Sequence, residues 1–424
     1  MNRIYKYISK DTYKSLSTLF GGTLIASIIP LLASPVISRL YAPEYYGILG
    51  LFMSISGLTG VVAYAHYSQA IMLPKENEDA KQIVWFSLFI STAVSIISAL
   101  ILLVLSIFTN IIKSSEIGWW YFLLPLSVFF NGITTVLVIW ANRTKHYKNL
   151  VFNRIVQSIL TIALQVSVGF FIHNETGLMF GLLFGQFLSA LLLMLEFYYS
   201  RKKDINIGKP ILLGFKKIAF EYKKLLIYST PTEFINNFIN QTPIFLLQKF
   251  AGASYVGNYS FAIRFLGLPE QFISGAIVNV FKQKASETYS TTGGCRDIYL
   301  KTLKILSALA IVPFVITVLF APQIFSFVFG AKWTEAGIFA QFLSLIYLLR
   351  FIISPLTYTY ILARKFKEDF ILHLLFLAMT TVSFYITNIL FTEKKLLILG
   401  YSVSYSLIYL IYFYRSYKFS KNKQ

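Results

Sequence analysis

Charged residues are scarce in this chain. They make up 13% of its 424 residues, about half the share found in soluble domains. Cys295 is its one cysteine, so neither an internal disulfide nor a cysteine-rich metal site can form. Hydrophobic residues account for 56% of the chain and lie in long unbroken runs. These features exclude a soluble domain and predict an all-α integral membrane protein.

The common sequence motifs of enzymes are also missing. There is no G-x-x-x-x-G-K-[ST] phosphate loop, so the chain cannot drive transport by hydrolysing ATP itself. Neither H-E-x-x-H nor G-x-S-x-G is present, and the four histidines are scattered. We therefore predict a protein that is not an enzyme and holds no metal or cofactor. A membrane glycosyltransferase or polymerase stays as an alternative, although the large external loop expected for saccharide chemistry is absent.

Twelve apolar runs are long enough to cross a bilayer, which takes about 20 helical residues. The first follows a basic segment but is too long for a signal peptide and lacks an Ala-x-Ala cleavage site, so we interpret it as a retained helix. The ninth run is short unless residues 321–329 extend it, and residues 321–335 otherwise form the longest predicted external loop. The predicted spans are 16–38, 46–70, 83–108, 119–141, 151–172, 177–198, 225–248, 258–281, 305–320, 336–363, 370–391 and 396–414.

The basic residues predict the orientation. Thirty of the 38 Lys and Arg residues fall at the cytoplasmic side if the N-terminus is inside, and six fall at the opposite side. Such a bias is typical of bacterial membrane proteins, and both termini are then cytoplasmic. The net charge of +20 is explained by this placement and does not indicate nucleic acid as a partner.

An internal repeat divides the chain into two six-helix lobes. A shift of 210 residues aligns RLYAPEYYGILGLFMSISGL, from Arg39, with KFAGASYVGNYSFAIRFLGL, from Lys249, and pairs Gly47 with Gly257. We predict pseudo-symmetric lobes around a central cavity, an arrangement typical of transporters. The predicted N-lobe spans residues 1–198, a basic cytoplasmic linker spans 199–224, and the C-lobe spans 225–424.

The linker itself has a helical pattern. Ile211, Leu212, Phe215, Ile218 and Tyr222 recur at helical spacing, with lysines elsewhere around the helix. This pattern predicts an amphipathic helix on the anionic inner leaflet. An ordinary basic linker between two lobes is the other interpretation.

Two arginines fall inside predicted spans. A charge at the bilayer centre costs about 2.5–3.5 kcal/mol on insertion scales, so Arg264 and Arg350 are expected to face protein or water. Ser260, Arg264 and Gln271 lie on one polar stripe of their predicted helix. A guanidinium can donate two hydrogen bonds to a phosphate, which favours a cavity that binds an anionic group. Alternatively, Arg264 pairs with Glu233 or Glu270 and has a structural role.

Polar residues also mark the seventh predicted span, where Glu233, Asn237 and Asn240 lie largely on one face. We include them among the candidate cavity residues, with Glu233 as counter-ion, proton carrier or structural partner. A coupling ion, H+ or Na+, is left open. Weaker candidates, for which packing or interfacial roles are equally good explanations, are Arg39, His66, Gln69 and Glu270.

The two repeat stretches, together with AIMLPKENEDA after the second span, resemble bacterial polysaccharide flippases of the O-antigen type. Those proteins belong to the multidrug/oligosaccharidyl-lipid/polysaccharide exporter superfamily. The resemblance implies an undecaprenyl-diphosphate-linked oligosaccharide substrate, moved between leaflets of the inner membrane for lipopolysaccharide O-antigen, capsule or a similar polymer. It also implies membrane lipids, a polysaccharide polymerase and chain-length machinery as partners. An ion-coupled multidrug exporter of the same superfamily is the alternative.

Overall fold

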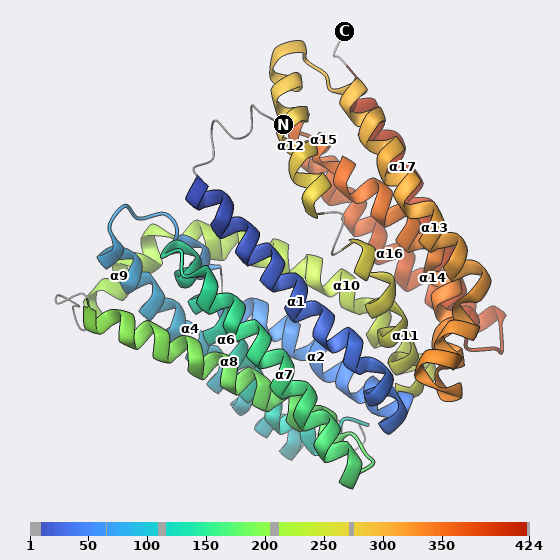
Figure 1. Ribbon diagram of the computed structural model, residues 1–424, viewed down its shortest axis with the longest axis horizontal. Helices are drawn as coiled ribbons and strands as arrows, with labels where there is room; N and C mark the ends of the chain where they lie inside the picture. Colours follow the sequence, from blue (N-terminus) through green and yellow to red (C-terminus); the bar gives the residue numbers. More distant parts are fainter. Residues whose placement is uncertain (1–9, 65, 109–115, 204–211, 271–274, 422–424) are drawn as a thin grey trace. The chain divides into compact units, whose positions relative to one another are not determined.

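The computed structural model describes residues 10–64, 66–108, 116–203, 212–270 and 275–421. Every regular element in these residues is helical (Figure 1), which confirms the predicted all-α class. The chain folds into two compact units. Unit 1 comprises residues up to 41 and residues 51–238, and unit 2 comprises residues 42–50 and 239–424.

Unit 1 is a bundle in which α7 packs on both α1 and α8, and α6 packs on both α4 and α8. Its core contains Phe86, Trp140 and Phe197, and the Phe197 ring makes edge-to-face contacts with the rings of Trp85 and Trp140. Two helices, α2 (Pro43–Tyr64) and α10 (Thr230–Ala251), contribute residues to both units. The other elements of unit 1 are α1 (Lys10–Leu40), α3 (Tyr67–Ala70), α4 (Asn77–Phe108), η2 (Gly118–Leu123), α6 (Leu124–Arg143), α7 (Tyr147–Phe171), α8 (Thr176–Lys203), α9 (Leu212–Glu221) and η3 (Leu225–Ser229).

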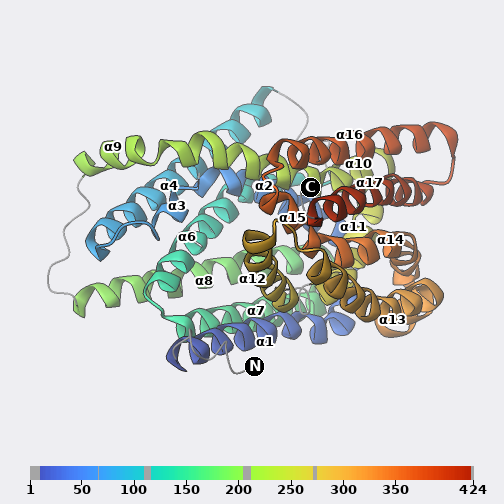
Figure 2. The ribbon, with the colours of Figure 1, turned by 90° about the horizontal axis from the view of Figure 1, so that it is seen from above.

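Unit 2 is a second bundle, in which α14 packs on three helices, α13, α17 and α11 (Figure 2). Its core includes Phe281, Tyr299 and Phe351. The elements of unit 2 are α11 (Ala253–Leu266), α12 (Gly275–Thr292), α13 (Arg296–Phe329), η5 (Ala331–Trp333), α14 (Thr334–Ile353), η6 (Ser354–Thr357), α15 (Tyr358–Leu362), α16 (Phe366–Leu390) and α17 (Leu396–Ser420).

The packing inside the two units follows the same order. In unit 1 the third span (α4) packs on the fourth (α6), and both the fourth and the fifth (α7) pack on the sixth (α8). Unit 2 repeats these pairs as α13 with α14, α14 with α17 and α16 with α17. The helix pairing therefore agrees with the repeat predicted from the sequence.

One turn is repeated in detail. Lys145, between α6 and α7, and Arg364, between α15 and α16, both adopt left-handed φ angles, 60° and 56°. The next residue in each turn donates its N–H to a carbonyl five residues back, His146 to Ala141 and Lys365 to Tyr360. Such six-to-one bonds satisfy carbonyls at a helix end and usually involve glycine. Here a basic residue takes that position in both halves.

Among the described residues, ten helices are long and apolar enough to cross a membrane. The predicted spans 225–248 and 258–281 are not among them. In the first, α10 carries several polar residues; in the second, α11 ends at Leu266 and α12 begins at Gly275. The ten candidate spans identify the chain as a multi-pass membrane protein.

The ninth span takes the longer of its two predicted forms. Residues 305–320 lie inside α13, which has 34 residues and continues through Pro313 and Pro322 to Phe329. The extension over residues 321–329 is therefore confirmed, and the external loop 321–335 is wrong for its first nine residues. Proline is tolerated within helices that pack in a membrane because neighbouring groups satisfy the freed carbonyls. The apolar run marks the membrane span, whereas the helix extends beyond it at both ends.

The linker helix forms as α9, but its apolar face packs on protein. Ile218 is buried, and Phe215 and Tyr222 lie against the core of unit 1. The Phe215 ring contacts the Phe86 ring with centroids 5.4 Å apart. This part of the face is therefore covered by unit 1, whereas Phe220 of the same helix is 64% exposed. The membrane-surface interpretation stays a prediction.

Candidate substrate site

The arginine inside α14 forms an ion pair. Nε of Arg350 donates a hydrogen bond to Oε1 of Glu270 at 3.2 Å and lies 2.9 Å from Oε2. Glu270 lies four residues beyond the end of α11. The two side chains are 40% and 22% exposed, so the pair is not sealed in the core. A charged pair that keeps this exposure inside membrane helices is a candidate for binding a ligand.

Tyrosines surround this pair. Arg350 lies over the Tyr347 ring, 5.9 Å from its centroid, and Tyr405 and Tyr409 are near enough to interact electrostatically with the guanidinium. On α17 the Tyr405 ring is 5.5 Å from the Tyr409 ring, centroid to centroid. The region thus combines one guanidinium and one carboxylate with aromatic faces and hydroxyl groups.

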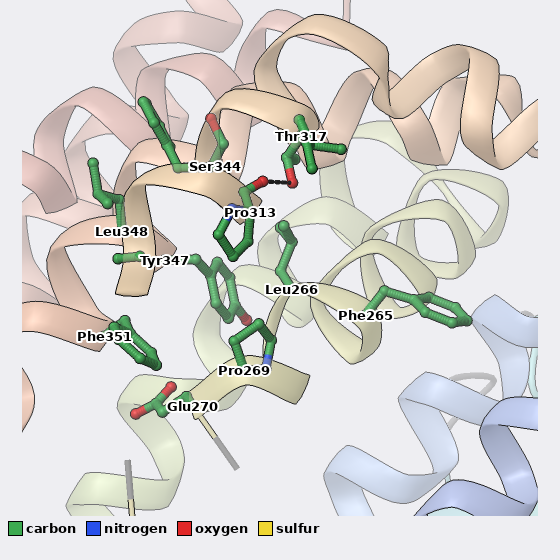
Figure 3. Close-up of a pocket in the computed structure, with 13 residues that line it drawn as sticks. Phe265, Leu266, Pro269, Glu270, Pro313, Thr317, Ser344, Tyr347, Leu348 and Phe351 are labelled. Carbon is green, nitrogen blue, oxygen red and sulfur yellow. Dashed lines mark hydrogen bonds between the residues drawn. The ribbon is translucent and has the colours of Figure 1, made fainter. Parts of the chain in front are cut away.

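A pocket of about 310 Å³ adjoins the ion pair. Figure 3 shows the Tyr347 ring beside Pro269 and Pro313, with Glu270 at the edge. Its walls come from α13, α14 and the segment after α11, and most of the lining is apolar. The lining residues are Phe265, Leu266, Pro269, Glu270, Ala310, Pro313, Phe314, Ile316, Thr317, Ser344, Tyr347, Leu348 and Phe351.

The second predicted arginine is not in this pair. Arg264 lies in the last turn of α11 and is exposed. Within the described residues its side chain makes no hydrogen bond or ion pair, so Glu270 is the partner of Arg350 and not of Arg264. Ser260, one turn earlier, directs Oγ toward Gly50, where a Cβ atom would lie 2.8 Å away. Gln271, the third member of the predicted stripe, lies outside the described residues.

The polar face of α10 is partly satisfied within its own helix. Asn237 donates its amide to the Glu233 carboxylate at 3.1 Å and to the Glu233 carbonyl at 3.0 Å. Both side chains are half-buried, whereas Asn240 is exposed. Glu233 and Asn237 belong to unit 1, and Asn240 belongs to unit 2. Glu233 therefore has an amide as its neighbour within unit 1.

The weaker candidates in unit 1 lie at helix ends. Arg39 is exposed near the end of α1, and Gln69 is exposed on α3. His66 has a left-handed φ of 55° and ends the second predicted span early, at Tyr64. Its buried Nδ1 has no hydrogen-bond partner among the described residues.

Sequence reasoning missed the tyrosines around Arg350. The signal was present, since Tyr401, Tyr405 and Tyr409 are spaced by four and so share one face of a helix. In the part of the chain that the structure describes, no group of three His, Cys, Asp or Glu side chains could hold a metal.

Similar folds are found among membrane transporters. A multidrug resistance transporter of the MATE family, in the MOP superfamily and solved in an inward-facing conformation, superposes with a TM-score of 0.71 at 17% identity, covering 92% of this chain and 93% of that chain. The lipid II flippase MurJ, in an inward closed conformation, superposes with a TM-score of 0.69 at 16% identity, covering 95% and 90%. The chain thus has the fold of this transporter superfamily.

Sequence comparison places the chain more narrowly. Residues 36–338 match the model of a family described as polysaccharide biosynthesis protein, and the chain belongs to that family. It is also 23% identical over 369 residues to an uncharacterized membrane protein in the cps region of Klebsiella pneumoniae, covering 83% of this chain and 70% of that protein. It is therefore a multi-pass membrane protein associated with polysaccharide synthesis.

Proposed function

We propose that this protein is a flippase that moves undecaprenyl-diphosphate-linked oligosaccharide repeat units from the inner to the outer leaflet of the cytoplasmic membrane by alternating access. The repeat units would serve surface polysaccharide synthesis, such as O-antigen or capsule. Both termini would be cytoplasmic, and a polymerase would take up the flipped units. The family supports the link to polysaccharide, and the likeness to a lipid II flippase supports a lipid-linked substrate.

The observation that carries the proposal is the surroundings of Arg350. Guanidinium groups bind phosphates through paired hydrogen bonds, and tyrosine rings and hydroxyls suit the faces and hydroxyls of sugars. An apolar pocket lies next to both groups. A lipid-linked sugar contains an anionic group, a saccharide and an apolar chain, so it matches all three surfaces.

Glu270 would act as a stand-in for the diphosphate when no substrate is bound. Its Oε1 accepts from Arg350 Nε at 3.2 Å, and a phosphate oxygen accepts from a guanidinium in the same way. Arg264, exposed and without a partner among the described residues, would supply a second guanidinium. In this mechanism substrate binding exchanges one acceptor of Arg350 for another.

The competing proposal is an ion-coupled multidrug exporter, with Glu233 or Glu270 as the coupling carboxylate and H+ or Na+ as the ion. The half-buried carboxylate of Glu270 beside an apolar pocket favours it. Drug sensitivity after deletion of the gene, with surface polysaccharide unchanged, would support the exporter. Formation of longer glycan by the purified protein from lipid-linked sugars would instead identify a polymerase.

The decisive experiment asks on which leaflet the lipid-linked repeat unit accumulates after deletion. Sealed spheroplasts and inverted vesicles expose opposite leaflets to a glycan-binding lectin. We expect the unit to accumulate on the inner leaflet in the deletion strain and to return to the outer leaflet on complementation. An unchanged distribution in the deletion strain would contradict the flippase.

A further inference from the structure

The pocket beside Glu270 is built from matching faces of two helices. Ala310, Pro313, Phe314 and Thr317 recur at spacings of three and four along α13, so they share one face. On α14, Ser344, Tyr347, Leu348 and Phe351 do the same. The two helices pack on each other, and the small side chains at Ala310, Thr317 and Ser344 leave space between them.

The pocket has an apolar way in from the bilayer. Ile316 lines the pocket and is 46% exposed. Its neighbours on α13, Val312, Val315 and Leu319, are also exposed and apolar. An exposed apolar surface on a membrane-spanning helix faces lipid. The pocket lining therefore continues at Ile316 into the lipid-facing apolar surface of α13, and a hydrocarbon chain can reach the pocket from that side.

One edge of the pocket is charged. Glu270 lies there and is bonded by Arg350, while the opposite wall at Leu348 and Phe314 is apolar. A purely apolar molecule would leave Arg350 and Glu270 unused, whereas a ligand with an anionic head and a hydrocarbon tail contacts both surfaces. The pocket volume of about 310 Å³ is at the lower end for ligand pockets, so it takes part of a long chain and not its whole length.

We propose that this pocket binds the first isoprene units of a polyprenyl diphosphate, those next to the diphosphate held at Arg350. This inference rests on the proposed flippase function and adds a site for the lipid part of the substrate. The methyl branches of isoprene units fill an irregular pocket lined by prolines and aromatic rings better than a straight acyl chain does. Ordinary phospholipid is therefore the competing occupant.

Photolabelling tests the proposal with the full-length protein in lipid nanodiscs. The probe is a polyprenyl diphosphate with a diazirine in an isoprene unit near the diphosphate, and labelled peptides are identified by mass spectrometry. We expect labels on α13 and α14 near Thr317 and Leu348. Excess unlabelled polyprenyl diphosphate should abolish labelling, whereas phosphatidylglycerol or inorganic pyrophosphate should not. Labels confined to other helices, or equal competition by phosphatidylglycerol, would overturn the proposal.

A pocket-filling variant gives an independent test. Thr317→Phe places a ring inside the pocket, and Ile305→Phe adds a ring on the exposed side of α13, outside the lining and away from the apolar surface around Ile316. We expect Thr317→Phe to weaken labelling about tenfold, since it displaces buried chain carbons, and Ile305→Phe to leave it unchanged. Equal effects of the two variants would contradict the site. If Thr317→Phe does not fold, the positions of the labels on the unaltered protein decide whether the probe binds in this pocket.

The proposed function and this site can fail separately. Leaflet accumulation in the deletion strain depends on the flippase function alone. If the repeat unit accumulates on the inner leaflet but the probe labels peptides outside α13 and α14, the flippase stands and the tail site is wrong. If no accumulation occurs, the proposed flippase function is wrong. The tail site, which rests on that function, then fails with it.

Discussion

Gly257 and Gly47 lie so close that a Cβ atom on Gly257 would be 2.9 Å from the Gly47 nitrogen. The same atom would be 1.8 Å from the Pro43 carbonyl oxygen, and a Cβ on Gly47 would be 1.9 Å from the Ala253 carbonyl oxygen. Residues 43 and 253 are related by the same 210-residue shift as the two glycines. The start of α2 and the start of α11 therefore cross, within unit 2, at equivalent positions.

Alanine at this crossing is expected to destabilise the protein. In Gly257→Ala the new methyl group meets backbone that cannot rotate away, so the helices must separate at a cost of about 1–3 kcal/mol. Thermal unfolding in detergent measures the loss. Gly57→Ala on α2 is the matched control, since a Cβ there meets nothing within 4 Å, and a helical Gly→Ala change stabilises by about 0.5–1 kcal/mol. Equal melting temperatures for both variants would contradict the tight crossing.

Arg350 and Glu270 can be separated by a double-mutant cycle. Arg350→Gln leaves a half-exposed carboxylate unpaired, and we expect a stability loss smaller than the about 3–5 kcal/mol of a fully buried pair. Export of surface glycan should fall about tenfold or more, because the phosphate loses its donor. Glu270→Gln should retain export, since Arg350 remains.

The double variant distinguishes a ligand-binding role from a structural one. Arg350→Gln with Glu270→Gln removes both charges, so stability should return toward that of the unaltered protein while export stays low. Protein level in membranes and surface polysaccharide are measured together. Normal export by the double variant would show that the pair only stabilises unit 2.

Arg264 can be replaced without breaking an ion pair among the described residues. It is exposed and makes no ion pair among the described residues, so Arg264→Ala should change the melting temperature little. If Arg264 binds the diphosphate, export should fall about tenfold, and Arg264→Lys should recover part of it by restoring the charge. Unchanged export by Arg264→Ala, at normal protein level, would remove Arg264 from the site.

Arg143 is expected to be structural. Its guanidinium donates to the Asn77 side chain at 3.1 Å and to the carbonyl oxygens of Ile71, Lys75 and Glu76 at 2.9, 3.3 and 3.2 Å. These bonds fix the segment between α3 and α4 against the end of α6. Arg143→Ala should lower the free energy of unfolding by about 1–3 kcal/mol, measured by thermal unfolding.

Two further variants define the origin of that loss. Arg143→Lys should not restore stability, because an ammonium cannot reproduce the planar fork. Lys148→Ala, an exposed basic residue on α7, should have little effect and serves as the control. A similar loss in Lys148→Ala would indicate that net charge, and not the hydrogen bonds of Arg143, is responsible.

Cys295 is expected to resist alkylation in the folded protein. The side chain is 1% exposed, and burial raises the pKa of its thiol from 9.0 to about 11. The thiolate fraction at pH 7.5 is therefore about a hundredfold below that of an ordinary thiol. Maleimide labelling should be slow in mild detergent and complete in SDS. Rapid labelling of the folded protein at pH 7.5 would contradict this burial.

The same pKa gives a pH dependence with a defined sign. The thiol ionises near 9.0 in the unfolded chain and near 11 in the folded one. Above about pH 9 the unfolded chain binds fewer protons, so this group lowers the free energy of unfolding as the pH rises. Cys295→Ala should remove that contribution between pH 9 and 11, as measured by thermal unfolding.

The sequence predicted the helical bundle because long apolar runs follow directly from the bilayer as solvent. It left the end of α13 open. Residues 321–329 are largely apolar but include Pro322, and only the structure shows that the helix continues from Arg296 to Phe329. Composition along the chain reports where lipid lies and not where a helix ends.

The candidate site shows the same division. The sequence by itself determined that Arg350 would be a charge within a membrane helix, because that helix is marked by its own apolar residues. Only the tertiary structure decided that Glu270 pairs with Arg350, that Tyr405 and Tyr409 of α17 lie beside them, and that α13 and α14 leave a pocket there. Those contacts of Arg350 join residues 55 or more positions apart, and the pocket depends on the packing of facing helices, which is set by side-chain shape in three dimensions.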